Sequence, residues 1–322
     1  MRSSGFPLLL VAAGIVALVL TQRPHPATTP ILVASSTQTL SEFLASEPYL
    51  LANVAGFLVV IALLRRRGFF SARSLTVPRR DVGAHNPVIW FICGLIVWLS
   101  AGTTMGIVSG LLPSGGLLDS PGVQNQTIAY AAGYGAGLTV GILLAYLLHA
   151  SAPACGLGVS FKSFFQGMLA MVVAWPVIAC IGAAAVGAHL LTGGARPDPL
   201  AHATLQSLVQ NPQNPWVLAQ VLLAVIAAPI QEEIIYRGML QSAILAATKR
   251  VWVSVGITSI LFAAAHLSPG TGVPWYAAVA LFGLSIAIGL TFERTGKLSV
   301  AIGMHIAFNL ANVAMALLGS RS

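Results

Sequence analysis

Nine long apolar runs dominate the sequence of 322 residues and constrain its fold more than any other feature. A transmembrane helix needs about 20 mostly apolar residues, and most of these runs have about that length. The runs are continuous and do not alternate apolar with polar residues, so they are typical of membrane helices and not of a membrane β-barrel. They cover approximately residues 6–21, 48–64, 88–112, 127–149, 164–191, 215–235, 251–267, 274–292 and 298–318.

The composition agrees with this pattern. Hydrophobic residues make up 57% of the chain and charged residues only 7%, and the mean hydropathy is +0.86. Soluble domains usually carry about 25% charged residues, so this chain lacks the polar surface of a water-soluble fold. We therefore predict an all-α, polytopic transmembrane helix bundle of about eight or nine spans. Its expected location is the cell membrane, and the inner membrane if the source is bacterial.

The basic residues indicate topology. The chain has 16 Lys and Arg against 8 Asp and Glu, which gives a formal net charge of +8. Most of them lie in short segments between apolar runs, and cytoplasmic loops are enriched in such residues. The loop 65–87 is therefore predicted to be cytoplasmic, and strict alternation of spans places most other basic residues on that side. No basic stripe interleaves with aromatic residues, so a nucleic-acid partner is rejected.

Two polar linkers, residues 22–47 and 192–214, divide the chain. We predict an N-terminal membrane region over residues 1–195, with the Arg-rich loop 65–87, and a second membrane region over 196–322, in which polar residues enter the apolar runs. Residues 1–21 suit a retained membrane anchor or a signal peptide. The anchor is favoured because no convincing A-x-A cleavage site follows. Three widely separated cysteines are interpreted as packing residues: Cys93, Cys155 and Cys180.

Two adjacent carboxylates interrupt an apolar run. Six of the eight acidic residues, Glu293 among them, lie in predicted loops, but Glu232 and Glu233 are surrounded by apolar sequence. Each ionised residue at the centre of a membrane helix costs roughly 2.5–3.5 kcal/mol. Together with Arg237 the cluster costs on the order of 7–10 kcal/mol unless it is paired, protonated or hydrated. A chain retains such a cluster mainly when a function uses it.

Helical spacing separates the two carboxylates. Glu233 and Arg237 are four residues apart and share one helix face, so they can form an ion pair that stabilises the helix. Glu232 lies about 100° around the helix from Glu233. It can face a different partner and act as a general base.

Two histidines and an amide can reach Glu232. A turn near 249–250 would place Glu232 and His266 level in an antiparallel helix pair, each about 25 Å from the turn. His305 and Asn309 are four residues apart on a third helix and can converge on the same point. The expected constellation is one carboxylate, two imidazoles and one amide from three helices.

These residues form three ordered motifs: EEIIYR at 232–237, FAAAH at 262–266 and HIAFN at 305–309. The set resembles the E-E-x-x-x-R, F-x-x-x-H and H-x-x-x-N motifs of the CPBP family of intramembrane proteases. That family includes type II CAAX prenyl endopeptidases and bacterial proteins linked to bacteriocin self-immunity. The resemblance covers about residues 215–312, roughly a third of the chain.

The resemblance implies a role for each motif residue. Glu232 would activate water, His266 and His305 would complete the catalytic centre, and Asn309 would help to form the oxyanion site. Three residues would support them: Glu233, Arg237 and Phe262.

Two mechanisms stay open for such a centre. In one, Glu232 activates water without a metal; in the other, Glu232, His266 and His305 hold a divalent metal such as zinc in an open three-ligand site. The sequence has no H-E-x-x-H helix, the usual zinc-protease signature. The metal-free mechanism is favoured, and no cofactor is firmly assigned.

The sequence therefore predicts an intramembrane endopeptidase that cleaves a membrane-associated peptide or protein, in contact with the lipid bilayer. One alternative is a proton-coupled transporter, since buried Glu and His side chains also form proton relays. Another is a non-catalytic immunity or scaffold protein. Transport predicts ion-dependent flux without a cleaved product, and a scaffold predicts that function survives Glu232→Ala.

Overall fold

The computed structural model describes residues 50–69, 71, 78–112, 121–195, 197, 203–267 and 273–319. All elements within these residues are helical, which confirms the all-α prediction. Six helices among them are long and apolar enough to cross a membrane: Pro87–Leu111, Gly122–Ser151, Phe161–Leu191, Pro215–Thr248, Trp275–Thr295 and Leu298–Leu318.

The prediction of eight or nine spans is not confirmed. The helix α3 (Leu50–Arg66) has 17 residues and α12 (Val251–Ala265) has 15, and both are shorter than the roughly 20 residues that a span needs. The predicted run 6–21 lies outside the described residues. Apolar sequence alone does not fix where a helix begins and ends, so the number of spans beyond these six stays a prediction.

The glutamates lie within one long helical stretch, Pro215–Thr248. Asn214 caps its start by accepting a hydrogen bond from the Trp216 N–H, and Lys249 ends it in a left-handed conformation with φ of 56°. Two π-helical segments interrupt the stretch, and such segments are frequent at functional sites. The stretch contains, in order, α9 (Pro215–Leu222), η2 (Leu223–Ala227), α10 (Ala228–Glu233), η3 (Ile234–Gln241) and α11 (Ser242–Thr248).

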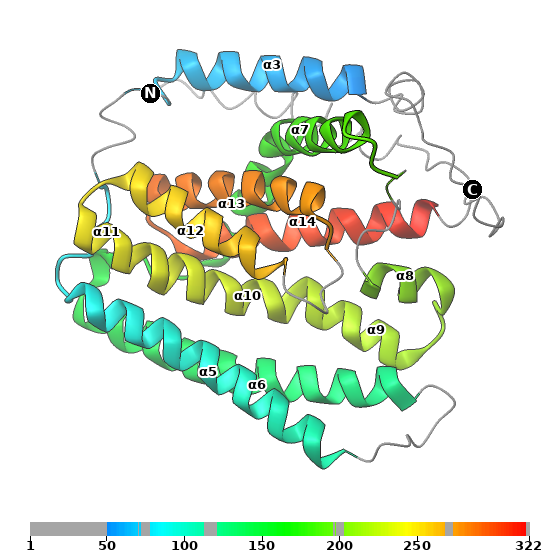
Figure 1. Cartoon of the computed structure of the whole chain (residues 1–322). Helices are drawn as coiled ribbons and strands as arrows, with labels where there is room; N and C mark the ends of the chain where they lie inside the picture. The colour runs from blue at the N-terminus through cyan, green and yellow to red at the C-terminus, as the bar shows by residue number, and fades with distance from the viewer. Residues whose placement is uncertain are drawn as a thin grey trace.

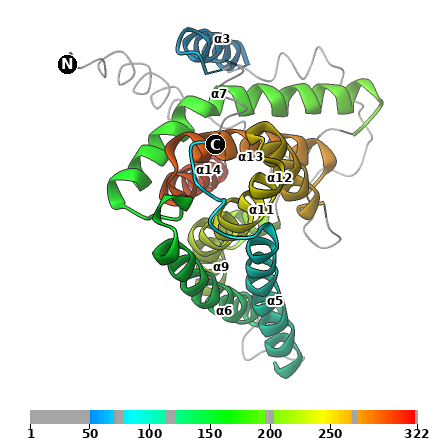
Figure 2. The same cartoon turned by 90° about the vertical axis from the view of Figure 1, so that its left-hand side faces the viewer.

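The other helices pack on two sides of this stretch (Figures 1 and 2). On one side lie α5 (Pro87–Leu111) and α6 (Pro121–Ser151), which pack against each other. On the other side lie α12, α13 (Trp275–Thr295) and α14 (Leu298–Gly319). Beyond them α7 (Phe161–Leu191) packs on α13 and α14, and α3 packs on α7. Two short elements complete the described fold: η1 (Pro153–Cys155) and α8 (Ala203–Gln210).

Small residues allow α7 and α14 to approach closely. A Cβ added at Gly167 would collide with the carbonyl oxygen of Val300, and one added at Gly303 would collide with the carbonyl oxygen of Phe164. Helices in membranes pack through such small residues because close backbone contact strengthens van der Waals attraction. These two helices come from opposite sides of the predicted boundary at residues 195 and 196, and the boundary itself stays a prediction.

Substitution of Gly167 by alanine is expected to lower the free energy of unfolding by about 1–3 kcal/mol, the usual effect of overpacking. The obstacle is a backbone carbonyl, which cannot rotate away as a side chain can. Gly102→Ala is the matched control, because nothing lies within 4 Å of a Cβ there. Thermal unfolding in detergent should show a lower Tm for Gly167→Ala alone; equal Tm values would contradict the close contact.

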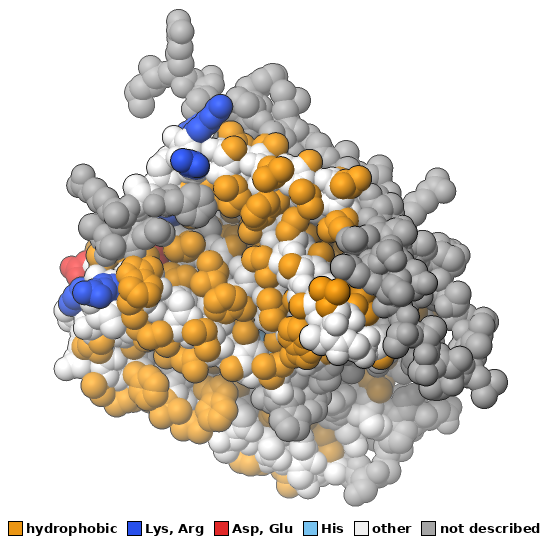
Figure 3. Space-filling model, turned by 45° about the horizontal axis from the view of Figure 1, so that its top comes forward, with side chains coloured by type: hydrophobic (Ala, Val, Ile, Leu, Met, Phe, Trp, Pro, Cys, Tyr) orange, Lys and Arg blue, Asp and Glu red, His pale blue; other side chains and the backbone are white. Residues whose placement is uncertain are grey.

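The outer surface is apolar, as contact with lipid requires. Figure 3 shows hydrophobic side chains over much of the described part of one face. On α5 the exposed side chains include Phe91 and Trp98, which are 54% and 62% exposed. Soluble proteins rarely expose apolar patches of this extent. The chain is therefore a multi-pass membrane protein.

Candidate active site

Three segments of the bundle carry the predicted site residues. Glu232 and Glu233 end α10, and Arg237 follows in η3. Phe262 lies near the end of α12, and His266 follows the last residue of that helix. His305 and Asn309 lie on α14, which contacts both α10 and η2.

A fully buried ion pair forms the base of the site. Arg237 Nη1 donates to Glu233 Oε1 at 3.2 Å, and Arg237 Nε lies 3.2 Å from Glu233 Oε2. Both side chains are 0% exposed. The ion pair predicted from the i, i+4 spacing is therefore present, and its opposite charges offset much of the cost of burial.

Glu233 also orients His305. The Nδ1 atom of His305 lies 2.8 Å from Glu233 Oε1, and the histidine is 4% exposed. A carboxylate that pairs with an arginine accepts hydrogen bonds, so this contact favours the His305 tautomer that carries the proton on Nδ1. The other ring nitrogen, Nε2, then holds the lone pair and is free to accept a proton.

Glu232 faces that free nitrogen. Its Oε2 lies 3.8 Å from His305 Nε2. This distance is too long for a direct hydrogen bond, and it suits two groups that share one bridging water. The Glu232 side chain is 25% exposed, in contrast to the fully buried Glu233. The two adjacent carboxylates thus occupy different environments, as the helical spacing predicts.

Arg237 has a further partner that the sequence did not reveal. Its Nη2 donates to the hydroxyl of Ser285 at 2.8 Å and to the carbonyl of Ser285 at 3.2 Å. The guanidinium also lies over the Phe262 ring, 4.9 Å from the ring centroid. A single serine inside an apolar run carries no charge or spacing signal, so Ser285 could not be predicted as a partner.

Phe262 lies between the two histidines. Its ring centroid is 4.7 Å from that of His266 and 5.7 Å from that of His305. The His266 Nδ1 atom lies 2.8 Å from the Phe262 carbonyl oxygen. The Tyr236 and Phe262 rings are in contact, with centroids 5.1 Å apart. Tyr236 lies four residues after Glu232, and Phe262 lies four residues before His266. Their contact is therefore expected if Glu232 and His266 are level in the antiparallel helix pair. The structure therefore joins His266 to the site through Phe262.

Asn309 is held by a backbone carbonyl. Its Nδ2 donates to the Ala224 carbonyl oxygen at 2.9 Å. Ala224 lies in η2, so the amide joins α14 to the stretch that carries the glutamates. Asn309 lies about one helical turn from His305 on α14, as the spacing predicts.

The donor atoms do not form a metal site within the described ranges. No group of three or more His, Cys, Asp or Glu side chains there is arranged to hold a metal ion. Glu232 Oε2 and His305 Nε2 lie 3.8 Å apart, and the alternative that these two residues hold a metal together with His266 stays a prediction.

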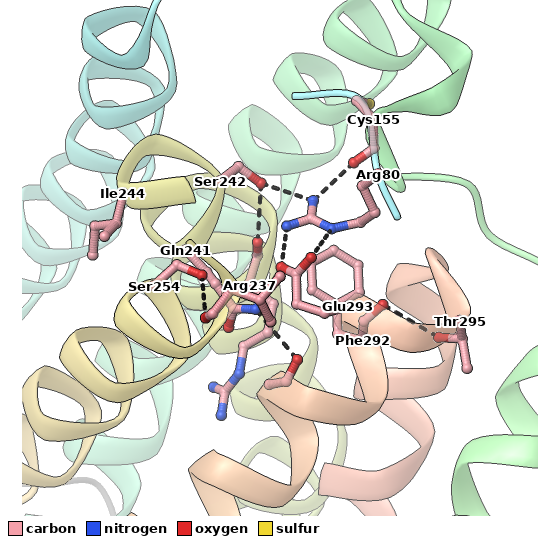
Figure 4. A network of polar contacts seen from close by, with 12 residues as sticks. Arg80, Cys155, Arg237, Gln241, Ser242, Ile244, Ser254, Phe292, Glu293 and Thr295 are labelled. Carbon is pink, nitrogen blue, oxygen red and sulfur yellow. Dashed lines mark hydrogen bonds and ion pairs between the residues drawn. The ribbon is translucent and has the colours of Figure 1, made fainter. Parts of the chain in front are cut away.

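A second buried network lies one helical turn further along the same stretch (Figure 4). Arg80 forms an ion pair with Glu293, and both side chains are almost fully buried. Arg80 Nε donates to Glu293 Oε2 at 3.1 Å, and Nη1 donates to Ser242 Oγ at 3.0 Å and to the Cys155 carbonyl at 2.8 Å. Gln241 Nε2 donates to Glu293 Oε1 at 2.7 Å.

This network corrects two expectations. Glu293 was predicted to lie in a loop, yet it is 3% exposed within α13. Arg80 was assigned only to the topology of the loop 65–87, yet it is 4% exposed. Each charge is buried because the other neutralises it, and the two residues are 213 positions apart in the sequence. A reading of local hydropathy therefore could not find the pair.

Cys155 behaves as a packing residue. It lies in η1 and is fully buried, and its carbonyl accepts a hydrogen bond from Arg80. Burial raises the pKa of the Cys155 thiol, so the side chain is neutral at physiological pH.

Residues 214–311 match the family model described as type II CAAX prenyl endopeptidase Rce1-like. The matched region contains all seven predicted site residues, from Glu232 to Asn309. No curated protein and no solved structure shows significant similarity to the chain. The match agrees with the resemblance of the three motifs and supports a CPBP-family protease region of the Rce1-like type at residues 214–311.

Proposed function

We propose that the chain is an intramembrane endopeptidase that hydrolyses a peptide bond of a membrane-associated peptide or protein. The observation that carries this proposal is the 3.8 Å separation of Glu232 Oε2 from His305 Nε2. Both atoms can accept a proton, and Glu233 holds the imidazole in place. A water molecule between two such acceptors is polarised for attack on a carbonyl carbon.

In the proposed reaction Glu232 takes a proton from this water while the water oxygen attacks the scissile carbonyl. His305 Nε2 positions the water, and His266 stabilises the charge that develops. The carbonyl oxygen becomes an oxyanion, to which the Asn309 amide donates. Preorganised donors of this kind stabilise the transition state more than the ground state.

The tetrahedral intermediate then collapses. Glu232 returns the proton to the leaving nitrogen, the C–N bond breaks, and a carboxylic acid and an amine are released; the acid then loses its proton to the amine or to solvent. The Glu233–Arg237 pair takes no proton in this scheme. It fixes the tautomer and the orientation of His305, which keeps Nε2 facing Glu232.

The test is cleavage of a library of membrane peptides by the protein purified in detergent, with products identified by mass spectrometry. We expect the wild type to cleave and Glu232→Ala and His305→Ala to be inactive. His189→Ala is the control, since His189 lies in the last turn of α7 and contacts Trp275 and Tyr276. A chelator should leave cleavage unchanged.

Other outcomes would favour a different account. Equal cleavage by the wild type and both site variants would remove the proposed centre. Loss of cleavage with chelator alone would overturn the metal-free scheme. Ion-dependent flux of a peptide without any cleaved product would instead support a proton-coupled transporter.

A further inference from the structure

One backbone carbonyl in η2 is left without a donor from its own helix. The carbonyl of Ala224 would accept from the N–H of residue 228 in an α-helix, or from that of residue 229 in a π-helix. The N–H of Ala228 donates instead to Leu223. Residue 229 is a proline and has no N–H. Neither possible donor of the helix therefore reaches Ala224.

Asn309 supplies the missing donor. Its Nδ2 lies 2.9 Å from the Ala224 oxygen, and Asn309 is partly buried. Ala224 is half-buried, and a carbonyl that is partly withdrawn from water is costly to leave without a partner, so the contact is favoured over an empty one. The contact uses one hydrogen of the Asn309 amide and leaves the second free to donate.

From this geometry we infer that Pro229 is a positioning residue for Asn309. Because Pro229 has no N–H, no donor at position 229 competes for the Ala224 carbonyl. The carbonyl therefore accepts its hydrogen bond from the Asn309 amide. That bond sets the side-chain orientation of Asn309, one turn away from His305. The inference rests on the proposed function, in which the second amide hydrogen donates to the oxyanion.

Pro229→Ala tests the inference because alanine restores an N–H that competes for the Ala224 carbonyl. We expect kcat to fall on the order of 10-fold, part of the 10²–10³-fold loss of a whole oxyanion donor. KM and Tm should change little, because alanine is a better helix former than proline. In the Asn309→Ala background, Pro229→Ala should cause no further loss.

Pro176→Ala is the matched control. Pro176 is also buried inside a helix, in α7, where it packs against Gly56 and not against the site. We expect this variant to keep the wild-type kcat. A role of Pro229 in folding alone would instead change Tm while leaving kcat per folded molecule unchanged.

A measurement on the amide itself separates this inference from the proposed function. In protein labelled with ¹⁵N-asparagine, Pro229→Ala should shift the side-chain amide signal of Asn309, which Asn309→Ala identifies, and Pro176→Ala should not. Wild-type kcat together with an unshifted amide signal in Pro229→Ala would overturn the inference. If the wild type cleaves no peptide, the proposed function fails, and the amide signal alone decides whether Pro229 positions Asn309.

Discussion

Substitution of Arg80 by methionine is expected to lower the free energy of unfolding by about 3–5 kcal/mol, the usual cost of breaking a buried ion pair. The substitution would leave Glu293 ionised at 3% exposure with only Gln241 as a hydrogen-bond donor from this network. It would also remove the donors to Ser242 and to the Cys155 carbonyl, and the stacking of the guanidinium over Phe292. Thermal and denaturant unfolding in detergent measure the change.

Two further variants show whether charge is the cause. Arg79→Met is the matched control, since Arg79 is exposed and its Nη1 donates a long contact of 3.4 Å to the Arg294 carbonyl. We expect it to stay within about 0.5 kcal/mol of the wild type. The double variant Arg80→Met/Glu293→Met should recover much of the loss, because a buried pair replaced by apolar residues is often neutral. Equal losses for Arg79→Met and Arg80→Met would contradict the network.

The contacts that the sequence predicted, the Glu233–Arg237 pair and the approach of Glu232 to His305, have local signals. Two glutamates inside an apolar run are conspicuous, since each charge there is costly. Helical spacing then distinguishes Glu232 from Glu233: Glu233 pairs with Arg237, and the two carboxylates lie beside opposite ring nitrogens of His305. The pairing of Tyr236 with Phe262 also follows from counting residues on either side of the turn after Lys249.

The other contacts of the site and of the neighbouring network join residues that are far apart in the sequence, and no local pattern predicts them. Arg80 meets Glu293 across 213 residues, and Ser285 meets Arg237 across 48. The π-helical turns redirect backbone hydrogen bonds without any change in hydropathy, so the Ala224 carbonyl could not be recognised as a partner of Asn309. The count of eight or nine spans is not confirmed for a related reason, because hydropathy does not report that α12 ends after 15 residues.

Substitution of Glu232 by glutamine is expected to abolish most of the catalytic activity and to leave stability almost unchanged. Glutamine keeps the size of the side chain but cannot accept a proton from water, and loss of a general base costs about 10²–10⁴-fold in rate. The side chain of Glu232 is 25% exposed and is not the partner of Arg237, so its charge contributes little to folding. The expected pattern is a low kcat with a wild-type Tm.

The most direct measurement is the turnover number of Glu232→Gln on a peptide that the wild type cleaves, normalised to folded protein. A fall of about 10²–10⁴-fold with an unchanged Tm is the predicted result. A turnover number close to that of the wild type would contradict the assignment of Glu232 as the base.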